Sequence, residues 1–220
     1  MVTTVNRQQS TVNSQQSTDN SQQSTVNRQQ STDNSLIMLN FTEIARLGLL
    51  GRRITHAFLT IPDFTDWLVA AGLVLVYTSI ALPVGFWSGF LKIDVQTSWR
   101  TIVGVLIGCL LSPGITEELL FRVLMLPHPS ENASGLILWF WGCTSLALFV
   151  VYHPLNALTF YPIGRSTFMN PVFLLLAAIL GGACSIAYLQ SGSIWPAVAV
   201  HWLGVTVWLL LLGGYRRLYG

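Results

Sequence analysis

Residues 101–126 read TIVGVLIGCLLSPGITEELLFRVLML, an apolar stretch interrupted by two adjacent glutamates and an arginine. A helix that crosses a bilayer needs about 20 predominantly apolar residues, so this stretch is long enough. Charged residues stay rare well beyond it. Between residues 101 and 212 they are Glu117, Glu118, Arg122, Glu131 and Arg165. The sequence therefore predicts that this part of the chain lies in a membrane.

The composition of the whole chain gives the same prediction. Hydrophobic residues make up 52% of its 220 residues and charged residues 9%, whereas soluble domains carry about 25% charged residues. So few charges leave too little polar surface for a soluble protein. The formal net charge of +2 is too small to indicate a nucleic-acid partner. We predict an integral, multi-pass membrane protein whose surroundings are the lipid bilayer.

Four further apolar stretches have the length of a membrane span. They lie at about 67–89, 134–153, 171–190 and 194–213. With residues 101–126 they predict an all-α fold, a polytopic bundle of about five spanning segments around a polar cavity within the membrane. The membrane-embedded domain is expected over residues 67–220.

Two different segments precede this domain. Residues 1–37 contain a polar seven-residue repeat with at most one apolar residue per copy, so no coiled-coil seam is available and we predict disorder. Residues 38–66 include an amphipathic pattern. Apolar residues recur there every three or four positions, and charged residues, mainly arginines, lie between them. This pattern predicts a helix that lies in the membrane interface.

The charged residues of 101–126 follow a Pro-Gly break at 113–114. On a helix, Glu118 and Arg122 are four residues apart and pair. Glu117 points about 100° away from that pair. An ion pair beside a spare carboxylate suits general-base catalysis. A structural alternative is equally open: Thr116 caps a helix, the glutamates complement its N-terminal dipole, and Arg122 reaches the interface.

Two histidines add weight to the catalytic interpretation. His153 ends the third apolar stretch, directly before Pro154, and His201 lies within the fifth. If the fifth helix begins near Ser193, His201 lies about 10 Å inside it. Ionisable residues at such depth are costly and are functional candidates by default. Each histidine alone is also compatible with a packing role, but three polar positions on three helices together indicate one site.

The remaining histidines and the cysteines carry little functional signal. His56 follows the arginines of the amphipathic pattern and His128 lies between two prolines, so we predict both to be solvated. Cys109, Cys143 and Cys184 lie singly within apolar segments. Without a CxxC or Cys/His spacing they are predicted to be small core residues.

The order and spacing of these residues match a known pattern. Its elements here are Glu117-Glu118-x-x-x-Arg122, Phe149-x-x-x-His153 and a later helix with His201. The set resembles the CAAX protease and bacteriocin-processing family, also called the Abi family, over about residues 67–213. The resemblance implies a membrane-embedded protease-like domain that hydrolyses a peptide bond without a covalent intermediate and without a cofactor.

The resemblance also implies a role for each residue. Glu117 and His153 would activate a water molecule, and His201 would stabilise the oxyanion together with the residue four positions later. Glu118 and Arg122 would hold the site together. The substrate would be a membrane-associated protein or peptide, cut near a membrane-anchored or lipidated C-terminus.

One position departs from the family pattern. The third motif of the family ends in Asn or Asp, whereas here it is His201-Trp-Leu-Gly-Val205. Valine offers no hydrogen-bond donor, and one lost oxyanion contact typically costs about 2.7–4 kcal/mol of barrier. The candidates for a replacement donor are Asn156, Thr206 and the indole of Trp202.

Two rival hypotheses remain open. Glu117, His153 and His201 have the ligand chemistry of a catalytic zinc site, although the chain has no HExxH motif. Alternatively, the protein is a catalytically weak membrane binding or assembly factor on the same fold, which Val205 favours. Chelator sensitivity separates the first rival from a metal-independent protease, and the effect of substituting Glu117 separates the second.

Overall fold

The computed structural model describes Gln23 and residues 47–219. The chain divides into two compact units, Met1–Leu50 and Gly51–Gly220. In the first unit, residues 47–50 are helical. The second unit contains all the candidate site residues.

The predictions for the N-terminal segments are only partly covered by the structure. Apart from Gln23, the repeat predicted to be disordered over residues 1–37 lies outside the described residues. The same holds for residues 38–46 of the predicted interfacial segment. Within the second unit, residues 51–59 of that segment form a helix.

Within residues 51–219 the regular structure is helical, apart from one isolated bridge between Asp94 and Leu212. The main α-helices are α2 (Phe64–Trp87), α3 (Trp99–Cys109), α5 (Gly135–Leu158), α7 (Pro171–Ser191) and α8 (Ile194–Leu211). Shorter helices are α4 (Thr116–Glu118), α6 (Arg165–Phe168) and α9 (Gly214–Tyr219). Two π-helical segments, η1 (Leu110–Ile115) and η2 (Leu119–Val123), flank α4, and the 3₁₀ turns η3 (Pro129–Glu131) and η4 (Pro162–Gly164) lie in loops.

Five helical segments of the described chain are long and apolar enough to cross a membrane, with 18 to 25 residues each. They are α2, the broken segment Trp99–Val123, α5, α7 and α8. The prediction of an all-α, multi-pass membrane protein with five spans is therefore confirmed. A regular α-helix pairs its backbone groups within itself, which is what the hydrocarbon interior demands.

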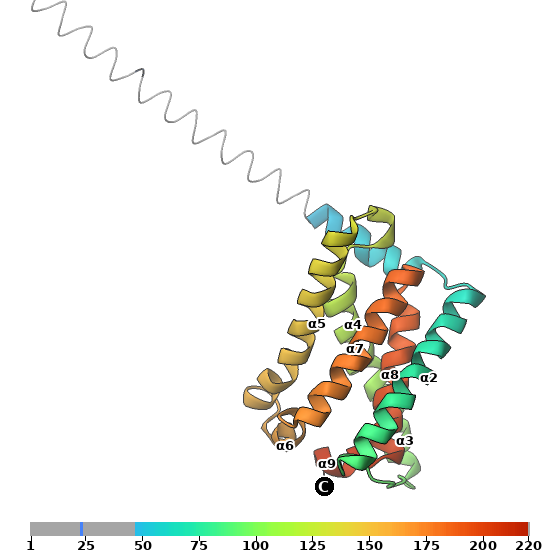
Figure 1. The fold of residues 1–220 in the computed structure, drawn as a ribbon, viewed down its shortest axis with the longest axis vertical. Coiled ribbons are helices and arrows are strands. Elements are labelled where there is room, and N and C mark those ends of the chain that lie inside the picture. Colours follow the sequence, from blue (N-terminus) through green and yellow to red (C-terminus); the bar gives the residue numbers. More distant parts are fainter. Residues whose placement is uncertain (1–22, 24–46, 220) are drawn as a thin grey trace, which may run out of the picture. The chain divides into compact units, whose positions relative to one another are not determined.

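Helices α7 and α8 form the centre of the bundle (Figure 1). Helix α7 packs against α2, α5 and α8, and these two central helices hold most of the buried residues of the five spans. Both have local signals that fix their ends. The Asn170 side chain accepts from the Val172 N–H to cap α7, and Gly192 ends it with a positive φ of 66°. Ser193 then caps α8.

Helix α5 extends further than the sequence predicts. The sequence predicts a helix end at His153, but the helix continues through Pro154 to Leu158. Proline removes one backbone donor, yet membrane helices tolerate it where neighbouring groups compensate. The extension matters for the site, because it places Asn156 on the same helix as His153.

The second span is interrupted where the Pro-Gly pair predicts a break. Ser112 has an extended backbone, with φ −142° and ψ 119°, and the chain continues through η1, α4 and η2. Gly114 is buried within this interruption, where an added Cβ would lie 2.7 Å from the Cys109 carbonyl oxygen. The break therefore needs glycine, and it sets the direction of the short α4 helix that carries Glu117 and Glu118.

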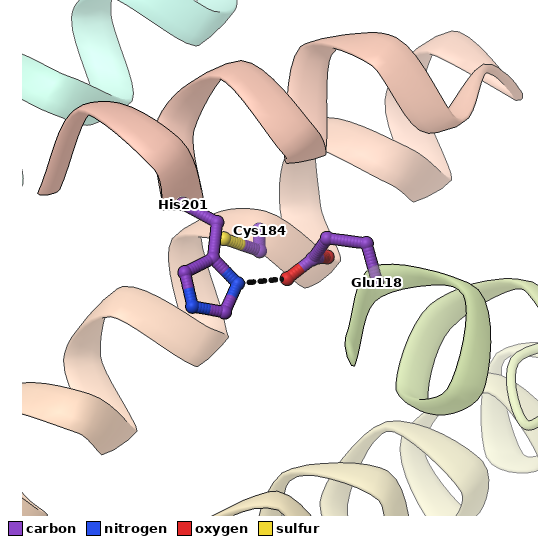
Figure 2. Close-up of side chains that lie close together, drawn as sticks. All are labelled: Glu118, Cys184 and His201. Atoms are coloured by element: carbon purple, nitrogen blue, oxygen red, sulfur yellow. Dashed lines mark hydrogen bonds and ion pairs between the residues drawn. The ribbon is translucent and has the colours of Figure 1, made fainter. Parts of the chain in front are cut away.

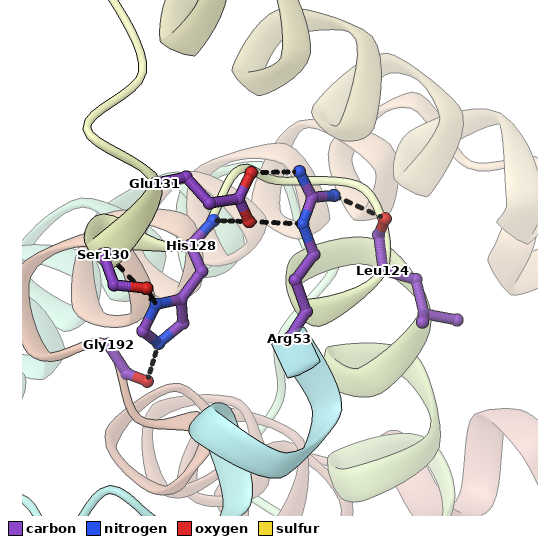
Figure 3. A network of polar contacts seen from close by, with 6 residues as sticks. All are labelled: Arg53, Leu124, His128, Ser130, Glu131 and Gly192. Carbon is purple, nitrogen blue, oxygen red and sulfur yellow. Dashed lines mark hydrogen bonds and ion pairs between the residues drawn. The ribbon is translucent and has the colours of Figure 1, made fainter. Parts of the chain in front are cut away.

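A polar network fastens the loop after η2 to two other parts of the unit (Figure 3). The Arg53 guanidinium donates to both carboxylate oxygens of Glu131, at 2.6 and 2.7 Å, and to the Leu124 carbonyl. His128 shares a hydrogen bond with the Gly192 carbonyl at 2.9 Å. The prediction that His128 is solvated is therefore wrong, since its side chain is buried. His56, by contrast, is exposed.

The electrostatics of this network favour an ionised Glu131. The hydrogen bonds from Arg53 hold the pKa of the Glu131 carboxyl below its usual value, and the bond from the His128 backbone N–H acts in the same direction. Because the network lies outside the five spanning segments, it stabilises a loop rather than the membrane core.

Candidate active site

The centre of the site is the carboxylate of Glu118, which lies on α4. Its Oε1 accepts a hydrogen bond from Nδ1 of His201 at 2.6 Å, and Nη1 of Arg122 lies 3.2 Å from the same oxygen. Figure 2 shows His201 reaching from α8 to this carboxylate. All three residues are almost fully enclosed, with exposed fractions of 0% for Glu118, 1% for Arg122 and 2% for His201. A buried anion is thus paired with a cation and an imidazole at once.

Arg122 makes two further contacts that fix the ion pair in the bundle. Its Nη2 donates to the carbonyl oxygen of Gly181 on α7 at 2.8 Å. Its guanidinium lies over the Phe149 ring of α5, with 4.5 Å between the central carbon and the ring centroid. The glycine is required for this approach, since a Cβ at position 181 would lie 2.9 Å from the Phe149 ring. The Glu118–Arg122 pair that the sequence predicts therefore joins the second, third and fourth spans.

Glu117 faces the other nitrogen of the same imidazole. Its Oε2 lies 3.8 Å from Nε2 of His201, beyond hydrogen-bond distance. A water or substrate atom that contacts both groups would have to lie beside the line that joins them, on the cavity side. The Glu117 side chain is 13% exposed. It is thus the more accessible of the two adjacent carboxylates. A general base that is not tied up in the ion pair needs such access.

His153 is held in one orientation by its own helix. Its Nδ1 lies 2.9 Å from the carbonyl oxygen of Phe149. Since a carbonyl can only accept, Nδ1 carries the proton, and Nε2 of the neutral ring is left as an acceptor. The Phe149 ring lies between the two histidines, with its centroid 5.0 Å from that of His153 and 5.9 Å from that of His201.

These residues border a cavity of about 490 Å³ within the bundle. Glu117, His153, His201, Phe149 and Val205 all line it. Most of the other lining side chains are aliphatic or aromatic, among them Tyr77, Leu91, Phe168, Phe173, Leu176 and Trp208. Glu118 and Arg122 are not part of the lining. The structure therefore separates the residues by position: the predicted catalytic side chains face the cavity, and the predicted supporting pair lies behind them.

Cys184 is a member of this site that sequence reasoning missed. It is fully buried on α7, and its Sγ lies within 4.8 Å of ligand atoms of both Glu118 and His201 (Figure 2). Within the described residues, this is the only group of three potential metal ligands so close together. Glu117, His153 and His201, the zinc ligands considered from the sequence, do not form such a group.

The geometry of that trio fits a hydrogen-bonded cluster better than a metal centre. The 2.6 Å between the His201 nitrogen and the Glu118 oxygen is a hydrogen-bond distance. Two ligands about 2.0–2.2 Å from a tetrahedral zinc ion lie well over 3 Å apart. The Arg122 guanidinium beside the same oxygen also adds a positive charge where a metal cation would sit.

The contact between His201 and Glu118 is the main feature of the site that the sequence did not predict. Spacing on one helix identified the Glu118–Arg122 pair, but a contact between residues 83 positions apart follows only from how α8 packs against the broken span. One signal in the sequence could have indicated this contact. A buried imidazole needs a hydrogen-bond partner, and Glu117 and Glu118 are the acids within the predicted spans.

Comparison with known families bears on this arrangement. The family model described as type II CAAX prenyl endopeptidase Rce1-like matches residues 98–207, half of the chain. The match runs from the start of the broken span to just past Val205, and so includes every candidate site residue. The chain belongs to this family.

Family membership fits the expected relationship to the CAAX protease and bacteriocin-processing proteins. A member of the Rce1-like family with five spanning helices is a multi-pass membrane protein and, in general terms, a CAAX-type intramembrane endopeptidase. Searches of curated proteins and of solved structures gave no match to the chain.

Proposed function

We propose that this Rce1-like protein hydrolyses a peptide bond of a membrane-associated protein or peptide with a water molecule activated by Glu117 and His153. The observation that carries the proposal is the shared cavity. Three ionisable side chains from three different spans, Glu117, His153 and His201, line one largely apolar space within the bundle. Polar groups that converge in an apolar pocket are the usual mark of an active site.

The hydrogen bonds support a specific division of labour. The water oxygen attacks the carbonyl carbon, and its proton passes to the Glu117 carboxylate. His153 orients the water through Nε2, which its bond to the Phe149 carbonyl leaves as an acceptor. The carbonyl oxygen becomes an oxyanion. When the intermediate collapses, the C–N bond breaks and Glu117 returns the proton to the leaving amine.

The charges around His201 support its role at the oxyanion. Arg122 and Glu118 balance one another, so a protonated His201 requires a second anion nearby. Before reaction that anion is Glu117, 3.8 Å from Nε2. Once Glu117 has accepted the water proton it is neutral, and the oxyanion takes its place as the partner of the imidazolium. The number of charges in the buried site stays constant, which avoids a large cost in a low-dielectric setting.

Glu118 acts through His201 in this scheme. Its bond to Nδ1 fixes the ring so that Nε2 faces Glu117 and the cavity. The orientation of a catalytic imidazole by a buried carboxylate on its far nitrogen is a recurrent arrangement in hydrolases. Glu118 and Arg122 are therefore proposed as positioning residues, and no metal is required.

The substrate class follows from the family name and the cavity. CAAX sequences are C-terminal motifs whose cysteine is prenylated. A prenyl chain is apolar, as is most of the cavity lining. We therefore propose a prenylated C-terminal peptide, presented from the bilayer, as the substrate.

The test is cleavage of a farnesylated peptide ending in a CAAX sequence by the purified protein in liposomes. The wild type should release the C-terminal fragment in the presence of a metal chelator, and Glu117→Gln should not. Full activity in Glu117→Gln would refute the mechanism. Inhibition by the chelator that zinc reverses would establish the metal-dependent alternative instead.

A second candidate function rests on Val205. This residue lines the cavity one turn beyond His201 and cannot donate a hydrogen bond. A binding or assembly factor on the same fold would retain the cavity without efficient catalysis. It would bind the farnesylated peptide, and Glu117→Gln would leave its biological function unchanged.

A further inference from the structure

The apolar side chain at position 205 poses a chemical problem for the proposed reaction. Val205 lines the cavity with His201 and Glu117, so the position where the family places an amide or a carboxyl faces the reacting groups here without a donor. Loss of one oxyanion donor typically reduces kcat by about 10²–10³. An efficient hydrolase with this cavity therefore needs another donor.

Two of the three candidate donors are excluded by their surroundings. The indole Nε1 of Trp202 donates to the Leu106 carbonyl oxygen at 2.9 Å, so it is already used to join α8 to α3. Thr206 is 6% exposed, its Oγ1 is enclosed by protein, and it is not among the residues that line the cavity. Neither group is available to a substrate in the cavity.

Asn156 lines the cavity. It lies on α5 three residues after His153, and residues three apart share a face of a helix. It lines the cavity together with Glu117, His153 and His201, and it is the only carboxamide among the described residues that do so. Tyr152 also borders the cavity, but its ring packs against Phe121 with 5.4 Å between centroids.

The backbone at Asn156 is firmly held, which a precise donor requires. Its carbonyl accepts from the N–H groups of Tyr161 at 2.7 Å and Phe160 at 3.0 Å, so the chain closes tightly over this end of α5. The continuation of the helix through Pro154 creates this placement. A helix that ended at His153, as the sequence predicts, would have left Asn156 in a loop.

We propose that Asn156 supplies the oxyanion donor that Val205 lacks. This proposal rests on the proposed hydrolytic function. As the water oxygen bonds to the carbonyl carbon, the carbonyl π electrons move to oxygen and the water proton moves to Glu117. The Asn156 amide then donates an N–H···O hydrogen bond to that oxygen, and no proton leaves the amide. A donor from α5 thus replaces a donor from α8.

The test is a swap of the donor between the two helices. Activity on the farnesylated CAAX peptide in liposomes is measured for Asn156→Ala, Val205→Asn and the double variant. The matched control is Thr159→Ala, at an exposed position directly after α5 that does not line the cavity. Asn156→Ala should reduce kcat by about 10²–10³ with little change in KM. Val205→Asn in that background should recover at least tenfold, whereas in the wild type it should change kcat by no more than a few fold.

The swap separates a catalytic amide from a structural one. A side chain needed only for folding would lower thermal stability, and Val205→Asn would not restore activity. The inference is overturned if Asn156→Ala keeps kcat within threefold of the wild type, if its defect lies in KM alone, or if Val205→Asn fails to rescue a stably folded Asn156→Ala protein. With Glu117→Gln inactive in the same assay, each of these outcomes rejects the role of Asn156 and leaves the hydrolytic function intact.

Discussion

Arg122→Met should destabilise the protein severely, because it removes the cation from a fully buried ion pair. The substitution leaves Glu118, which is 0% exposed, without its guanidinium partner. Breaking a buried pair by removing one partner costs about 3–5 kcal/mol. The substitution also removes the 2.8 Å hydrogen bond to Gly181 and the contact with the Phe149 ring. Since these effects overlap, we expect a loss of about 4 kcal/mol in the free energy of unfolding.

The assay is the amount of protein inserted in the membrane, together with its thermal unfolding in detergent. Arg165→Met is the matched control, because Arg165 is exposed on α6 and its loss should change stability by less than about 0.5 kcal/mol. Combining Arg122→Met with Glu118→Gln should recover part of the stability, since no unpaired anion then remains. Wild-type abundance and heat stability in Arg122→Met would refute the reasoning, because the ion pair would then not support the bundle.

Two further predictions concern packing and pH. Gly181→Ala should lower the free energy of unfolding by about 1–3 kcal/mol, because its Cβ would lie 2.9 Å from the Phe149 ring. Gly182→Ala is the control and should be nearly neutral, since nothing lies within 4 Å of a Cβ there. Equal unfolding temperatures for the two variants would contradict this prediction. Arg53 lowers the pKa of Glu131 in the folded protein, so the pair contributes stability above the ordinary carboxyl pKa of about 4.3 and loses it as the pH falls through the folded value. Glu131→Gln should therefore destabilise the protein at pH 7, and this effect should shrink as the pH falls through the lowered pKa of the folded protein. A loss of stability that stays the same across an acid titration would show that ionisation of Glu131 plays no part.

The membrane fold could be predicted because hydrophobicity along the chain records it directly. Each of the five spans was found to within a few residues, except where a proline intervened. Proline ends most helices in water, so the sequence predicts that His153 lies at a helix end. Membrane helices tolerate an internal proline, and α5 continues to Leu158.

The sequence identifies most residues of the site but not the contacts between them. Ionisable side chains in apolar stretches are costly, which identified Glu117, His153 and His201, and helical spacing identified the Glu118–Arg122 pair. Spacing has no bearing on contacts between helices. The bond from His201 to Glu118 and the position of Cys184 beside them therefore required the structure.

His128 shows the same limit in a loop. Two flanking prolines predict an exposed turn, but its partner, the Gly192 carbonyl, comes from the turn between α7 and α8. That turn lies far along the sequence, so no local pattern indicates the contact.

The most direct test of the proposed mechanism is the kinetics of Glu117→Gln, His153→Ala and the double variant. All three are measured with the farnesylated CAAX peptide, in liposomes, with chelator present. If both side chains act on one water molecule, each single substitution should remove most of the activity and the double variant should lose little more. Losses that multiply in the double variant would show that the two residues act independently, and full activity in either single variant would contradict the shared-water mechanism outright.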